Sequence, residues 1–156
     1  MYDVITIADS ILKIAKKAGK RLTPLQLMKL TYIAHGWSLG LKRGALFSER
    51  IEAWKYGPVI PDLYHATKRW GRDPIPLENI EGAVDVDQDT EDFLEDVFQK
   101  YGHMNGIALS ALTHKPGTPW HDVYEQGVLG IEIPDALIEK HYEKLLNERS
   151  SRPPAR

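Results

Sequence analysis

One apolar segment, "TPLQLMKLTYIAHGWSLGL", constrains the fold of this chain more than any other. It opens with Thr23, Pro24 and Gln26 in the order of a helical capping box with proline in the first turn, so a helix begins here. Apolar side chains then occupy two faces of the helix, and only Lys29 and Gly36 mark a polar or bare strip. A helix that is apolar nearly all round must be covered by other elements. We therefore expect it at the centre of the domain.

Amphipathic stretches with helix start and stop signals lie on both sides of this segment. They predict helices over about residues 3–18, 61–70, 90–101 and 105–113, with Asp89 or Thr90 as the N-cap of the third, and further helices starting near 118 and 134. Between them, the helical period gives way to short apolar alternation and turn residues. The predicted fold is mainly α, a compact single-domain bundle of about six helices with a small β-hairpin-like insertion around residues 44–58. We expect the domain to cover 1–148 and a disordered tail to follow at 149–156.

The length and composition are those of one ordinary globular domain. The chain has 156 residues, and no apolar run approaches the roughly 20 residues that span a bilayer. The absence of cysteine excludes disulfides, thiolate metal sites and a cysteine nucleophile. The first ten residues lack the basic region of a signal peptide. These features predict a cytoplasmic protein without membrane contact.

Charge is distributed unevenly along the chain. Residues 1–72 carry a formal charge of +8 and residues 73–156 carry −10, although the net charge is only −2. A basic half can contact nucleic acid or an acidic partner, but the two halves can equally fold together and compensate each other. A lysine-rich stripe on the first helix, Lys13 to Arg21, would serve a DNA-binding repressor. The following helix is too apolar to read bases, so nucleic acid is an unfavoured partner.

The sequence contains few features that would indicate catalysis. His114, His121 and Asp122 flank the turn "KPGTPW" and could in principle serve a metal-assisted hydrolase, but their spacing matches no standard ligand pair. His35 is better placed as a packed core histidine. Nucleophile-elbow, phosphate-loop and dinucleotide-binding motifs are absent. We predict no enzymatic activity, no cofactor and no metal.

The stretch "IEAWKYGPVIPDLYHATK", residues 51–68, is a stiff aromatic corner. Pro58 and Pro61 fix φ on both sides of two aliphatic residues, so the segment loses little entropy on binding. Rigid aromatic side chains anchor many protein interfaces. Alternatively, Trp54 and Tyr64 fill the core where the chain reverses. Both interpretations stay open at this point.

Three separated blocks together resemble a known family. They are Lys29-Leu30-x-Tyr32-x-Ala34-x-Gly36-Trp37, then Trp54-x-Tyr56-Gly57-Pro58-Val59-x-Pro61-x-x-Tyr64, then Leu109-x-x-x-Thr113-His114-x-x-x-x-Pro119-Trp120. In this order they resemble the Panacea domain, the SocA-like antitoxin family that includes GepA-type phage-associated proteins. Two mild departures, Thr31 in place of an aliphatic residue and His35 in place of glutamine, fall on the central helix.

The resemblance implies an antitoxin that neutralises a cognate protein toxin, usually encoded by a neighbouring gene, by direct binding. One alternative is an adaptor that delivers the toxin to a cellular protease, using the acidic loop 73–90 or the tail 149–156 as a tether. Weaker alternatives are an autorepressor that binds DNA and the metal-assisted hydrolase. Eight residues are candidate partner contacts: Trp54, Tyr56, Gly57, Pro58, Tyr64, His65, His114 and Trp120.

Overall fold

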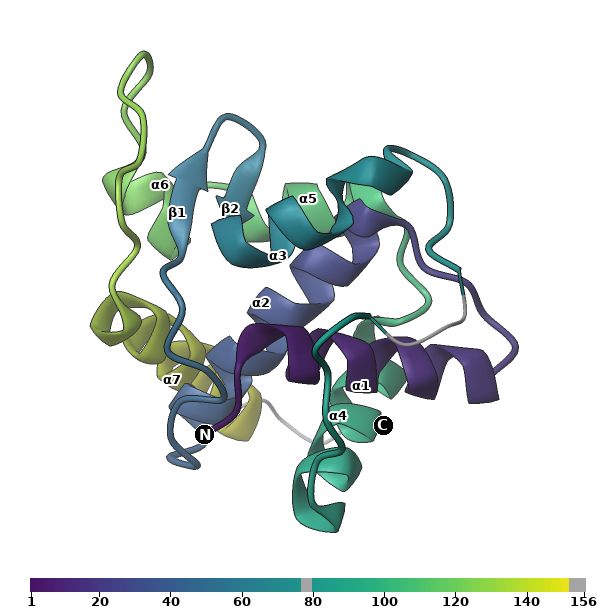
Figure 1. Cartoon of the computed structure of the whole chain (residues 1–156). Helices are drawn as coiled ribbons and strands as arrows, with labels where there is room; N and C mark the ends of the chain where they lie inside the picture. The colour runs from purple at the N-terminus through teal and green to yellow at the C-terminus, as the bar shows by residue number, and fades with distance from the viewer. Residues whose placement is uncertain (77–79, 152–156) are drawn as a thin grey trace.

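The computed structural model describes residues 1–76 and 80–151. Seven α-helices, one 3-10 helix and one hairpin occupy these residues (Figure 1). In chain order they are α1 (Val4–Lys17), α2 (Pro24–Gly40), β1 (Glu52–Trp54), β2 (Gly57–Val59), α3 (Pro61–Thr67), η1 (Lys68–Trp70), α4 (Gln88–Tyr101), α5 (Gly106–His114), α6 (Pro119–Val123) and α7 (Asp135–Ser151). The predicted mainly α fold is confirmed, with seven α-helices where about six were expected.

Helix α2 runs through the middle of the molecule and contacts α1, α3, α4, α5, α7 and β2 (Figure 1). Its capping box is formed as predicted, because Thr23 accepts from the backbone of Gln26 and the Gln26 side chain accepts from the backbone of Thr23. Every residue from Leu27 to Gly40 is buried. The prediction of a buried central helix is therefore confirmed, and it extends even to Lys29.

The hairpin is smaller than the predicted insertion and gains a neighbour from far along the chain. β1 and β2 pair antiparallel, with Glu52 opposite Val59 and Trp54 opposite Gly57. On the other edge of β1, Ala53 N donates to Ile131 O at 2.8 Å, and Ile133 N donates to Ile51 O at 2.8 Å. The loop that leads to this pairing, between α6 and α7, projects from the body of the molecule (Figure 1).

Helix α4 begins earlier than predicted. The sequence suggested Asp89 or Thr90 as its cap, but the N-cap is Asp87. The Asp87 carboxylate accepts hydrogen bonds from Thr90 Oγ1 and from Tyr2 Oη, the latter at 2.6 Å, and these contacts lower the pKa of Asp87. The long-range contact with Tyr2 favours the earlier start, and local sequence does not reveal it.

The described part of the acidic loop 73–90 is fastened to α1. Ile80 is buried and its backbone N–H donates to Asp9 Oδ1 at 2.9 Å, while Val84 N donates to Thr6 Oγ1 at 3.2 Å. These contacts make the described part an unsuitable tether.

Helix α7 continues to Ser151, three residues into the predicted tail, and positions 77–79 and 152–156 lie outside the described residues. Within the described chain, no helix combines the length and apolarity needed to cross a membrane.

Candidate partner-binding site

The turn of the hairpin is held by side chains from two helices. Lys29 Nζ on α2 donates to Pro58 O at 2.8 Å, and Ser110 Oγ on α5 donates to Tyr56 O at 2.6 Å. Gly57 has φ +118° and is buried, and a Cβ at this position would lie only 2.9 Å from Lys29 Nζ. Glycine is thus needed here both for its backbone conformation and for space. Gly57 and Pro58, both sequence candidates, fasten the hairpin to the body of the protein.

The two candidate tryptophans connect the hairpin to α6. Trp120 is 8% exposed, and its Nε1 donates to Trp54 O at 2.6 Å. Trp54 is half-buried, with its ring centroid 5.0 Å from that of Tyr64 in an edge-to-face arrangement. The ring of Trp120 stacks on Tyr124 and meets His114 edge-on. Two groups of aromatic rings, one around Trp54 and one around Trp120, are thus linked through the Trp54 backbone.

The exposed candidates lie at the hairpin tip and on α3. Tyr56, at the tip of the hairpin, is 67% exposed, and Tyr64 on α3 is 38% exposed. His65 is exposed beside Tyr64, with the two ring centroids 5.5 Å apart. Of the eight candidates, these three are exposed, and the other five are buried or half-buried.

A groove lies between the N-terminal half of α2, the hairpin and the α3–η1 segment, and we call it the hairpin groove. Its volume is about 370 Å³, and Trp54, Tyr56 and Tyr64 are among its lining residues. Lys29 also lines it, although this side chain is only 1% exposed. Burial lowers the pKa of Lys29 to about 7. The sequence revealed Lys29 only as a polar position on an apolar helix and gave no sign that a groove would form over it.

A second surface that sequence reasoning missed lies across β1 from the hairpin groove. It is formed by Trp54 and Lys55 on one side and by the projecting α6–α7 loop on the other. Leu129 in this loop is 95% exposed, between Gly127 and Gly130, which both have positive φ. The only sequence signal is that pair of glycines around two aliphatic residues.

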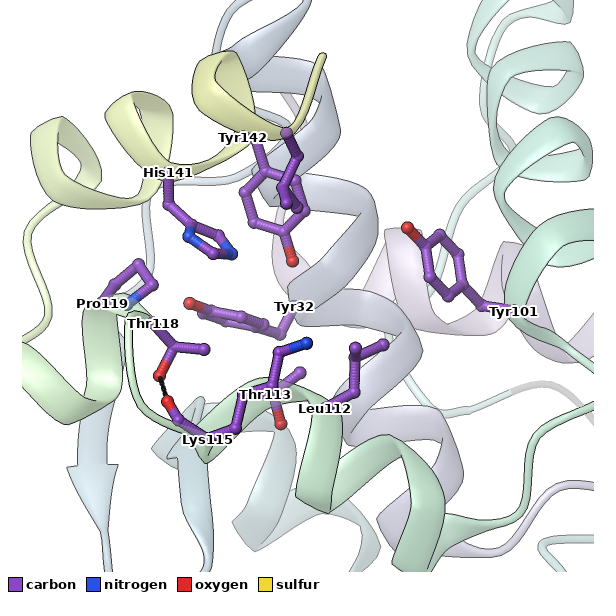
Figure 2. Close-up of a pocket in the computed structure, with 10 residues that line it drawn as sticks. Tyr32, Tyr101, Leu112, Thr113, Lys115, Thr118, Pro119, His141 and Tyr142 are labelled. Atoms are coloured by element: carbon purple, nitrogen blue, oxygen red, sulfur yellow. Dashed lines mark hydrogen bonds between the residues drawn. The ribbon is translucent and has the colours of Figure 1, made fainter. Parts of the chain in front are cut away.

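A smaller cavity, shown in Figure 2, lies where α7 meets α2 and the turn after α5. Tyr32, Tyr142 and His141 line it, and Thr118 Oγ1 donates to Lys115 O at 2.8 Å beside it. Burial raises the pKa of both tyrosines and lowers that of His141. At about 60 Å³ the cavity is far smaller than the roughly 300–1,000 Å³ of typical ligand pockets. It is a packing feature of the core.

The three residues considered for a metal site have different surroundings. His114 Nδ1 contacts the backbone oxygen of Ser110 and its ring packs on Trp120, whereas His121 and Asp122 are exposed on α6. Within residues 1–76 and 80–151, no three His, Cys, Asp or Glu side chains are grouped so that they could hold a metal ion. His35 is a core histidine as predicted, stacked on Phe47 with its Nε2 2.9 Å from Asp135 Oδ1.

Comparisons with known proteins agree with the three sequence blocks. The family model described as "Antitoxin SocA-like, Panacea domain" matches residues 27–121. The chain is also 31% identical over 155 residues to Antitoxin SocA of Caulobacter vibrioides (strain NA1000 / CB15N), covering 90% of this chain and 82% of that protein. No solved structure gives a significant match. The matched region contains the central helix, the hairpin, α3, α5 and Trp120, so the chain belongs to the SocA-like antitoxin family with a Panacea domain.

Proposed function

We propose that this chain is an antitoxin that neutralises a cognate protein toxin, encoded by a neighbouring gene, by binding it directly. The single observation that carries the antitoxin role is the similarity to Antitoxin SocA along nearly the whole chain. Neutralisation by binding requires no bond to be made or broken. The proposal therefore treats the chain as a binding protein without an enzymatic activity.

The aromatic face around the hairpin supports direct binding. Tyr56 and Tyr64 expose large side chains, and the backbone beneath them is held by hydrogen bonds from Lys29 and Ser110. Because this backbone is already ordered, little conformational entropy is lost when a partner docks. Exposed tyrosines on a rigid support are typical anchors of protein interfaces.

Co-expression of this chain with the product of the neighbouring gene tests the proposal. We expect growth to be rescued, the two proteins to co-purify, and rescue to persist in hosts lacking individual cytoplasmic proteases. Loss of rescue on deletion of one protease would favour delivery of the toxin for degradation. Failure of both rescue and co-purification would refute the antitoxin role.

Variants of two aromatic residues separate contact from support. Tyr56→Ala should abolish rescue while leaving the free energy of unfolding within about 0.5 kcal/mol of the wild type, because its side chain is exposed. Trp54→Ala should lower that free energy by about 2–3 kcal/mol, less than the roughly 3–5 kcal/mol of a fully buried aromatic, because Trp54 is half-buried. Leu41→Ala, an exposed apolar residue at the opposite end of α2, is the matched control and should retain rescue.

A further inference from the structure

Among the described residues, the basic and acidic side chains that line the hairpin groove are all lysines. Its basic lining residues are Lys29 on the floor, Lys55 at the hairpin tip and Lys68 on η1, and among the residues that the structure describes no aspartate or glutamate lines it. Glu52, the acidic residue of β1, is turned to Trp54 Nε1 and Arg50. The rest of the lining is mainly apolar or aromatic, including Met28, Val59 and Tyr64. Apolar walls strengthen the field of these cations, since they lower the local dielectric constant.

The floor of the hairpin groove holds a buried amine, Lys29 Nζ, whose hydrogen bonding is incomplete and which a bound carboxylate would favour in its charged form. A lysine ammonium group has three N–H donors, and among the described residues the acceptor found for Lys29 Nζ is Pro58 O, at 2.8 Å. No carboxylate forms an ion pair with Lys29 within the described chain. Burying an ammonium group without a counter-charge is costly. An incoming carboxylate would supply the missing partner.

The size of the hairpin groove suits side chains of a polypeptide. A volume of about 370 Å³ falls near the lower end of the roughly 300–1,000 Å³ found for ligand pockets, enough for one large apolar side chain and its neighbours. The cations come from three separate elements, so they can meet carboxylates at more than one position of a bound segment.

We propose that the hairpin groove binds a segment of the toxin in which an apolar side chain is flanked by acidic side chains. This inference rests on the proposed function, because it names the part of the toxin that the antitoxin recognises. The apolar side chain packs against Met28, Val59 and Tyr64, and one carboxylate pairs with Lys29. The rim lysines, Lys55 and Lys68, attract the remaining acidic side chains.

Charge reversal at the rim provides the first test, with the purified product of the neighbouring gene as the probe. The double variant Lys55→Glu/Lys68→Glu should bind this protein about thirty-fold more weakly or worse, and the loss should shrink at high salt because exposed charges are screened. The matched control, Lys16→Glu/Lys140→Glu, reverses two exposed lysines that do not line the groove and should bind within about twofold of the wild type. Equal affinity of the rim variant and the control would overturn the groove assignment.

The role of Lys29 on the floor of the hairpin groove is tested with the variant Lys29→Met, which nearly keeps the length of the side chain and removes its charge. On an array of overlapping peptides tiling the neighbouring gene product, the wild type should capture peptides that combine apolar residues with Asp or Glu, and Lys29→Met should not. Capture only of peptides without acidic residues would refute the proposal. If Lys29→Met does not fold, the rim variants still decide the question.

Different results would exclude the antitoxin function and the hairpin groove. If the wild-type chain neither binds the neighbouring gene product nor rescues growth, the antitoxin function itself is wrong. If it binds and rescues, but the rim and floor variants bind equally well, only the hairpin groove is excluded as the recognition site.

Discussion

The amine of Lys29 is separated from water beneath the hairpin, on a helix whose other neighbouring side chains are almost all apolar. Burial disfavours the charged form of this group, which lowers its pKa from 10.5 to about 7. The hydrogen bond to Pro58 O fixes the hairpin on α2. A neutral amine can also donate this bond, although more weakly than an ammonium group. The side chain thus has a structural role whether or not it is charged.

The lowered pKa makes the stability of the protein depend on pH in a defined direction. In the unfolded chain Lys29 stays protonated up to about pH 10.5, whereas in the folded protein it releases its proton near pH 7. Between these values the unfolded state binds more protons, so the contribution of Lys29 to stability rises with pH. Compared with Lys29→Met, the wild type should gain about 1–3 kcal/mol in free energy of unfolding from pH 7 to pH 9.

Denaturant titrations of both proteins between pH 5 and pH 9 measure this effect. The other titrating groups are common to the two proteins, so the difference between their free energies of unfolding isolates Lys29. Below pH 6 this difference should be constant, because Lys29 is then protonated in both the folded and the unfolded state. A difference that does not change above pH 7 would show that the folded protein keeps Lys29 charged.

At the scale of elements, the packing of α7 on α2 depends on two glycines. Helix α7 packs against α2 with Tyr142 lying directly over Gly36 and Gly40. A Cβ at Gly40 would lie 2.6 Å from Tyr142 Cβ, and one at Gly36 would overlap the ring of Tyr142. The ring also meets Trp37 edge-on, with the centroids 5.1 Å apart. The absence of side chains on one face of α2 therefore sets how near α7 can approach.

Gly36→Ala should lower the free energy of unfolding by about 1–3 kcal/mol, because the overlap with Tyr142 outweighs the better helix propensity of alanine. The test is a double-mutant cycle with Tyr142→Ala, in which removal of the ring should relieve the overlap. The loss from Gly36→Ala should then largely disappear in the Tyr142→Ala background. Equal losses in both backgrounds would mean that α7 does not pack on Gly36.

The sequence predicted those elements whose signals are local. The capping box at Thr23 and the Thr118–Pro119 start gave two helix N-termini correctly, since a cap is decided within one turn. The start of α4 was placed two or three residues late, because its cap at Asp87 is completed by Tyr2. The pairing of β1 with residues 131–133 was not predicted at all. It joins segments about eighty positions apart in the sequence, and the hydrophobic periodicity within each segment does not predict such a contact.

The candidate site was predicted only in part, for a similar reason. The aromatic and proline residues of 51–68 mark a stiff segment in sequence, but the alternation does not say which rings face outward. The structure buries Gly57 and Pro58 and exposes Tyr56 and Tyr64. Whether Lys29 and Leu129 are buried or exposed depends on which distant segments of the chain pack over them, and the local sequence does not show this.

At the scale of the whole molecule, the basic and acidic halves meet across α1. Between the halves, Lys13 Nζ lies 3.5 Å from Asp85 Oδ1 and Lys17 Nζ lies 3.4 Å from Glu91 Oε1. Within α1, Lys13 Nζ also lies 3.0 Å from Asp9 Oδ2. The hydrogen bond with Asp9 is the largest of the contacts that raise the pKa of Lys13. Part of the lysine-rich stripe is therefore neutralised within the molecule, which favours internal compensation over a DNA-binding surface.

Charge reversal on α1 tests this compensation. The carboxylate of Asp9 is almost fully buried, and it also holds Ile80 N, so a glutamate at position 13 would place a like charge beside it. Lys13→Glu should lower the free energy of unfolding by about 1–3 kcal/mol, whereas Lys16→Glu, at an exposed position on the same helix, should change it by less than about 0.5 kcal/mol. Denaturant titration measures both. Equal stability of the two variants would mean that Lys13 does not compensate the buried Asp9 carboxylate, and Lys13 would then be free for an external acidic partner.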